Sequence, residues 1–91
     1  MNADALKIVI AIVSVAAAGL TTAIGAVGAA YGESRIAAAA MDAMARQPDE
    51  TASITRNLFV SLAMVESTAI FCLVVALILL FANPFVSLIG R

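Results

Sequence analysis

A single carboxylate lies within the longest apolar stretch of this sequence. Glu66 is the only charged residue between Arg56 and Arg91, and it lies inside the segment 63–71. A charge buried in lipid costs several kcal/mol or more, so such a residue is usually neutralised, paired or functional. Because ionisable groups inside membranes commonly mark ion pathways, we take Glu66 as the candidate ion-binding residue. The alternative is a protonated glutamic acid that only hydrogen-bonds between helices.

A second carboxylate can reach the same depth. Glu33 directly follows 25 uncharged residues, 8–32. At 1.5 Å per residue, a helix would place Glu66 about 27 Å and Glu33 about 22 Å from the proline at position 48. Glu66 then lies near the middle of a bilayer whose hydrocarbon core is about 30 Å thick. The two carboxyls can therefore meet on neighbouring helices.

The elements that position these carboxyls are membrane helices. Of the 91 residues, 64% are hydrophobic and 12% are charged, and the mean hydropathy is +1.10. A soluble chain this short could not hide so many apolar residues in one core. The runs 8–32 and 57–82 each exceed the about 20 residues that span a bilayer, and backbone groups in lipid must bond internally. The sequence predicts a single domain, 1–91, of all-α class: a two-transmembrane-helix hairpin.

A polar break separates the two runs. Pro48 lacks an N–H group and restricts the residue before it, so the first helix should end near Arg46. We expect helices over about 5–45 and 50–82, a loop over about 46–49 and a short C-terminal tail. Acidic residues after the proline suit the first turn of the second helix, which has two candidate N-caps, Thr51 and Ser53.

The basic residues predict the orientation of the hairpin. Arg35, Arg46 and Arg56 lie on the loop side, whereas Lys7 and Arg91 lie on the side of the termini. The positive-inside rule therefore places the loop in the cytoplasm and both termini outside. We expect the long side chain of Arg35 to reach toward the headgroups on the loop side.

Small residues follow two sides of the first helix. One ridge contains Ala18, Thr22, Ala26, Ala30 and Ser34, and a second, roughly opposite, contains Gly28 and Gly32. Small residues let membrane helices approach closely. Two smooth sides suit a helix flanked by copies of itself, as a closed ring of identical subunits requires. The alternative is an ordinary alanine-rich membrane helix.

Several function classes are excluded or disfavoured. The net charge of −1 and the lack of a basic run argue against a nucleic-acid partner. The chain has no histidine, so the usual metal-ligand clusters are absent, and its single cysteine, Cys72, cannot form an intrachain disulfide. We assign no catalytic residue and no bound cofactor.

These features together resemble the c-subunit of rotary F-type ATP synthases. The combination of Glu33 with the stretch from Glu66 to Phe71 is similar to the divergent N-type branch of that family. The resemblance covers nearly the whole chain and rests on the hairpin, the small-residue track, Glu66, the loop at 45–48 and the closing segment 81–85. It implies a homo-oligomeric ring among membrane lipids, in a bacterial inner membrane. Glu66 would exchange an ion with the a-subunit of the membrane sector, and the central stalk of the catalytic head would bind the loop residues Arg46, Gln47 and Pro48.

Rotation of such a ring would couple ion flow to ATP synthesis or hydrolysis, with no catalysis by the ring protein itself.

The identity of the ion depends on two positions. Glu33 stands where sodium-binding relatives usually carry glutamine, and Phe71 where they carry tyrosine. Apolar surroundings and a second carboxyl both favour a neutral acid, so we predict the proton as the ion. The alternative is a sodium site, which needs several hard oxygen ligands. Its candidates are Glu33, Glu66, the Ser67 hydroxyl and the Met64 carbonyl, with Thr68 holding a water.

The sequence also bears on the size of the ring and leaves two other functions open. Alanines at 26 and 30 replace expected glycines, and the added width predicts a ring with many copies. Two readings of another class stay open: a small homo-oligomeric transporter that uses Glu66 as a substrate-coupled acid, and a pore-forming hairpin of the holin type.

Overall fold

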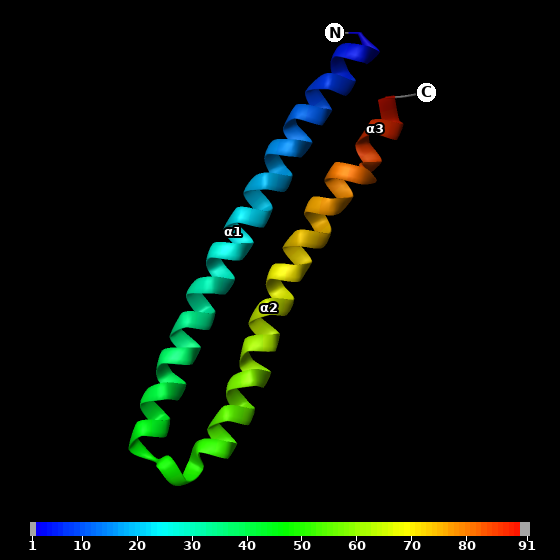
Figure 1. The fold of residues 1–91 in the computed structure, drawn as a ribbon. Helices are drawn as coiled ribbons and strands as arrows, with labels where there is room; N and C mark the ends of the chain where they lie inside the picture. Colours follow the sequence, from blue (N-terminus) through cyan, green and yellow to red (C-terminus); the bar gives the residue numbers. More distant parts are fainter. Residues whose placement is uncertain (1, 90–91) are drawn as a thin grey trace.

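Two long antiparallel helices make up the fold (Figure 1). The computed structural model describes residues 2–89, and the loop lies at one end of the hairpin with both termini at the other. The elements are α1 (Ala3–Arg46), the 3-10 turn η1 (Pro48–Glu50), α2 (Thr51–Phe81) and α3 (Pro84–Ile89). The predicted two-helix hairpin is confirmed. Arg91, which the orientation argument used, lies outside the described residues.

The first helix has a side-chain cap and a clear stop. Asn2 caps α1, because its Oδ1 accepts a hydrogen bond of 2.8 Å from the N–H of Ala5, and the helix therefore begins earlier than the expected position 5. At the other end α1 stops at Arg46, which pairs with Asp42 one turn back, just before Pro48. Proline and its effect on the preceding residue account for this end.

A hydrogen bond from Thr51 closes the loop. The hydroxyl of Thr51 donates to the carbonyl oxygen of Pro48 at 2.7 Å. The N-cap of α2 is Glu50, which makes no side-chain capping bond, so the expected N-cap role of Thr51 or Ser53 is wrong. The hydroxyl of Thr51 instead stabilises the 3-10 turn, which keeps the connection between the helices short.

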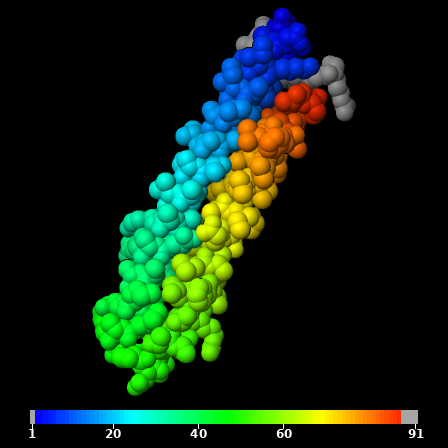
Figure 2. All heavy atoms as spheres, in the orientation of Figure 1, coloured from blue at the N-terminus to red at the C-terminus, as the bar shows by residue number. Residues whose placement is uncertain are grey.

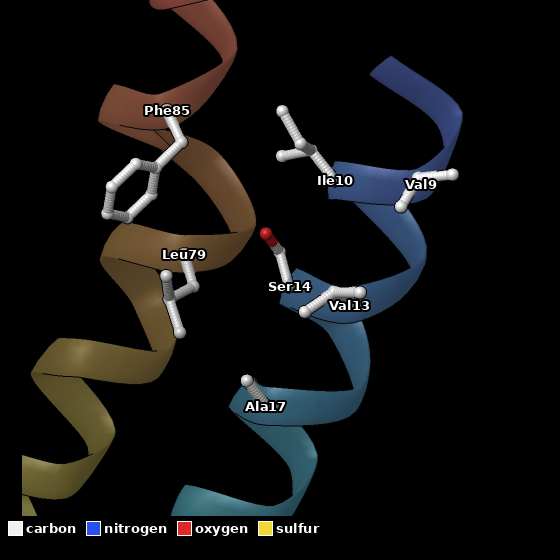
Figure 3. A pocket seen from close by; sticks show the side chains of 7 residues that line it. All are labelled: Val9, Ile10, Val13, Ser14, Ala17, Leu79 and Phe85. Atoms are coloured by element: carbon white, nitrogen blue, oxygen red, sulfur yellow. The ribbon is translucent and has the colours of Figure 1, made fainter. Parts of the chain in front are cut away.

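The C-terminal tail contains a short helix that the sequence pattern did not predict. The Oδ1 of Asn83 accepts a hydrogen bond of 2.9 Å from the N–H of Phe85, and its Nδ2 donates to the hydroxyl of Ser14 on α1. Ser14 is buried, and its hydroxyl points toward α2 between Ile10 and Leu79 (Figure 3). Asn83 therefore starts α3 and fastens it to α1.

Close contacts between small residues set the register of the hairpin. A Cβ placed on Gly25 would lie 2.8 Å from the Cβ and Sγ of Cys72. Seven residues later, a Cβ on Gly32 would lie 3.5 Å from a methyl of Val65, which is seven residues before Cys72. The register is thus constant along the hairpin. Glycine at 25 is required by the close approach of the two helices.

The hairpin is too thin to bury its own apolar side chains. Its Cα atoms extend over 68 × 16 × 11 Å, and the space-filling view shows one column of atoms for each helix (Figure 2). Among residues 2–89 the buried side chains are mostly small, as at Ala18, whereas Phe71 is 70% exposed. Each long helix contains an 18-residue stretch apolar enough to cross a membrane, and the mean hydropathies of the two stretches are 2.2 and 2.7. Lipid or further protein must cover this surface.

The small-residue ridges are only partly as predicted. Ala18 of one ridge and Gly32 of the other face α2, because the contact surface of α1 runs between them. Ala26, Ala30 and Gly28 stay exposed on the two flanks of α1. These flanks remain available for neighbouring copies.

The contact at Gly25 predicts that Gly25→Ala destabilises the hairpin. The new methyl would meet Cys72 at 2.8 Å and push the helices apart, at a cost of about 1–3 kcal/mol. Gly19→Ala is the matched control, because a Cβ there meets nothing within 4 Å. Thermal unfolding of the detergent-solubilised protein, followed by circular dichroism, measures both. Equal melting temperatures for the two variants would contradict the packing.

Candidate ion-binding site

Glu66 is the central residue of the second helix. Fifteen residues of α2, which runs over Thr51–Phe81, lie on either side of it. The helical rise puts the carboxylate about 22 Å from each end, which is mid-membrane for a spanning helix. The side chain is exposed on one flank of the hairpin. A carboxyl at this depth meets lipid or protein and has no route to bulk water.

The fold brings Glu33 to Glu66. Because Gly32 packs on Val65, the next residue of each helix projects toward the same flank, and the two carboxyls lie close to each other. We name this flank the Glu66 edge, defined by Thr22, Ala26, Ala30, Glu33 and Glu66. Two carboxylates so close cannot both keep a charge, so the pair needs at least one proton or cation.

An apolar hollow adjoins Glu66. It encloses about 170 Å³ and extends from Glu66 toward the end of the hairpin that carries the termini. The hydroxyl of Thr22 donates to the carbonyl of Ala18 at 2.8 Å, so its one proton is already used. The remaining walls of the hollow are apolar and are formed by Ala26, Ala69, Ile70 and Leu73. Glu33, on the same flank, is close enough to Glu66 for the two carboxyls to share a proton.

The other candidate ligands lie on different sides of the hairpin. One residue turns a helix by about 100° and two by about 200°, so the side chains of Ser67 and Thr68 leave α2 on other sides than Glu66. The hydroxyl of Ser67 donates to the carbonyl of Ala63 at 2.9 Å. One chain therefore does not assemble all the ligands of the sodium site, although a second copy alongside it could supply the missing ones.

The side chain of Arg35 points in another direction than the sequence analysis predicted, so that prediction is wrong. Its Nη1 donates to the hydroxyl of Tyr31 at 3.1 Å, and the guanidinium lies 5.7 Å from the centre of the ring. Tyr31 is one turn closer to the N-terminus, so the side chain points toward the middle of the membrane and away from the loop. Side chains on helices tilt toward the N-terminus, and the spacing of four residues could have indicated this pair.

The loop forms an exposed polar surface. Gln47 and Pro48 are exposed, and Arg46 is held by its ion pair with Asp42. A hollow of about 420 Å³ lies beside them, lined by Ala39, Asp42, Ala43, Arg46, Gln47 and Ile54. A short, exposed polar loop offers hydrogen-bonding groups to another protein.

Known proteins resemble this chain over most of its length. The family model for the ATP synthase C-subunit matches residues 16–79. A protein of Cereibacter sphaeroides, named as ATP synthase c-subunit 2, is 55% identical over 74 residues, which are 81% of this chain and 89% of that protein. The ATP synthase c-subunit of Synechococcus sp. (strain JA-2-3B'a(2-13)) is 51% identical over 79% of this chain and 89% of its own. The ATP synthase c-subunit of Petrotoga mobilis is 51% identical over 74% of this chain and 70% of its own length.

The contact between the carboxyls predicts how the infrared spectrum depends on residue 33. In Glu33→Gln the amide can still donate to the protonated carboxyl of Glu66, whereas Glu33→Ala removes the partner. Hydrogen bonding weakens a carbonyl bond, so the carboxyl stretch of Glu66 should lie at lower wavenumber in Glu33→Gln than in Glu33→Ala. The control, Asp42→Ala, should leave this band unchanged, since Asp42 pairs with Arg46. Identical bands in both Glu33 variants would refute the contact.

Proposed function

Because this chain belongs to the ATP synthase C-subunit family, we propose that it is the ion-carrying protein of the rotor ring, with Glu66 as the reversibly protonated carrier. It is not itself catalytic. The observation that carries the proposal is the pair of carboxyls, Glu33 and Glu66, close together on one flank at the middle of a membrane-spanning hairpin. Family membership favours this function over a small transporter or a pore-forming hairpin.

The membrane makes Glu66 a switchable carrier. A site that faces lipid must be neutral overall, so the carboxyl travels with its ion bound. In a polar interface with the a-subunit the acid can ionise, and a cationic group of that partner would attract the carboxylate as it passes. Loading on one side of this interface and release on the other turns ion flow into rotation. Rotation then couples to ATP synthesis or hydrolysis in the catalytic head.

The loop is proposed to bind the central stalk. Arg46, Gln47 and Pro48 provide an exposed polar surface at the end of the hairpin remote from both termini. The three arginines on the loop side favour a cytoplasmic loop, with the termini outside, in a bacterial inner membrane. A cytoplasmic loop would lie on the side of the membrane where the stalk of the catalytic head must bind the ring.

We propose the proton as the transported ion. Its support is the acid pair itself, because a protonated Glu66 can donate its proton to a carboxyl oxygen of Glu33, whereas a sodium ion needs several oxygen ligands. Phe71 offers no hydroxyl, the Ser67 hydroxyl already donates to the carbonyl of Ala63, and the side chain of Thr68 leaves α2 on the side opposite Glu66. The sodium site stays the alternative, with Glu33, Met64, Glu66 and Ser67 as its ligands. The large copy number of the ring also stays a prediction.

Glu66→Gln should abolish coupling while leaving the ring intact. Glutamine keeps the shape and the hydrogen bonding of the acid, but it cannot release a proton. We expect normal assembly together with loss of ion-driven ATP synthesis and of ATP-driven pumping, both measured on the reconstituted complex. Asp4→Asn, which removes a carboxyl at the far end of α1, is the control and should stay coupled. Coupled transport that survives in Glu66→Gln would defeat the proposal.

Labelling of Glu66 by a hydrophobic carbodiimide distinguishes the two ions. The reagent needs a protonated carboxyl in an apolar site, and the hollow beside Glu66 gives it access. With protons as the coupling ion, sodium should not slow the labelling of isolated rings at any pH. Clear protection by sodium at millimolar concentration and neutral pH would overturn the proton assignment and restore the sodium alternative.

A further inference from the structure

Arg35 is a permanent charge inside a membrane-spanning helix. It lies eleven residues before the end of α1, and within the described residues its side-chain partner is Tyr31 alone. A guanidinium stays protonated in proteins, so it cannot become neutral by losing a proton. Charged groups at membrane depth pair with one another or with polar groups of the bundle. A tyrosine hydroxyl leaves most of the five N–H donors of Arg35 without an acceptor.

The nearest carboxyl in sequence cannot pair with Arg35 inside the same helix. Glu33 is two residues away, which turns the helix by about 200°, so the two side chains leave α1 on opposite flanks. Asp42, on the loop side, already pairs with Arg46. The flank that carries Gly28, Tyr31, Arg35 and Met64 is named the Arg35 edge. One hairpin therefore carries a cation on one edge and the carboxyl pair on the other, at about the same depth.

We propose that Arg35 of one copy pairs with Glu33 of the next copy and so completes the ion site across the interface between copies. In a ring of parallel hairpins each copy sets one edge against the opposite edge of its neighbour, which brings the Arg35 edge to the Glu66 edge. The inference rests on the proposed ring. It adds a residue, Arg35, to a site that is incomplete in one chain.

Small residues on both edges allow the approach that this pair needs. On the Arg35 edge, a Cβ at Gly28 would meet nothing within 4 Å in the single hairpin. On the Glu66 edge, Ala26 and Ala30 are exposed at a similar level of α1. Glycine facing alanine lets the backbones of membrane helices come close, so a long arginine side chain can reach the neighbouring carboxylate.

Charge balance supports the assignment. Glu33, Glu66 and Arg35 of the neighbour are together neutral when they share one proton, as a site facing lipid must be. Arginine also matches a carboxylate with two parallel hydrogen bonds, which fixes the orientation of Glu33. Arg35 thus acts as a positioning residue, because it holds Glu33 in the direction from which Glu33 contacts Glu66.

Cysteine cross-linking tests the geometry in the assembled ring. In a Cys72→Ala background, the double variant Arg35→Cys/Glu33→Cys removes both charges together, and a bifunctional maleimide about as long as an arginine–glutamate pair should join neighbouring copies, since a disulfide would need Cα atoms within about 7 Å. The expected readout is a ladder of covalent oligomers on a denaturing gel. Each single cysteine variant is a control and should give no ladder, because its cysteines face away from one another. An intact ring without a ladder in the double variant would overturn the pairing.

A double-mutant cycle tests the charge. We expect Arg35→Gln to shift ring dissociation to lower temperature, and the same change in a Glu33→Gln background to cause a much smaller shift. Shifts that are equal in the two backgrounds would overturn the pair, and would indicate another partner such as a lipid phosphate. Failure of the wild-type protein to form any ring would instead defeat the proposed function. The two failures are therefore distinguishable.

Discussion

A carboxylate cannot stay charged in hydrocarbon without a partner, and the rest of this hairpin is arranged around that constraint. The mid-membrane position of Glu66 follows from its place at the centre of α2. Glu33, on the same flank, adds a second charge and makes a shared proton or cation necessary. A single hairpin leaves this pair exposed on its flank, so only a neighbouring protein surface can enclose it.

Close helix contact turns a sequence pattern into the geometry of the site. Gly25 and Gly32 let α1 approach Cys72 and Val65 on α2, and this contact fixes the register that sets Glu33 beside Glu66. The bond between Asn83 and Ser14 fastens the same register at the other end of the hairpin. The small residues therefore serve two purposes: some hold the two helices of one chain together, and others remain free on its flanks.

The sequence predicted the features that depend only on the order of residues along the chain. Apolar length indicated the two helices, Pro48 indicated the break between them, and a lone charge in an apolar run indicated Glu66. Directions of side chains depended on three-dimensional contacts that a linear pattern does not contain. Arg35 was expected to point to the loop and instead contacts Tyr31, and the hydroxyl of Thr51 closes a turn where a cap was expected. Asn83, which starts α3, bonds to Ser14, 69 residues away in sequence.

Imaging the isolated oligomer in lipid by electron cryo-microscopy tests the central claim most directly. We predict a closed ring of parallel hairpins in which the Glu66 edge of each copy packs against the Arg35 edge of the next. The carboxyl pair should then lie at mid-membrane between two copies. Hairpins that meet across a two-fold axis with their Glu66 edges facing each other, or that remain single in the bilayer, would contradict this account.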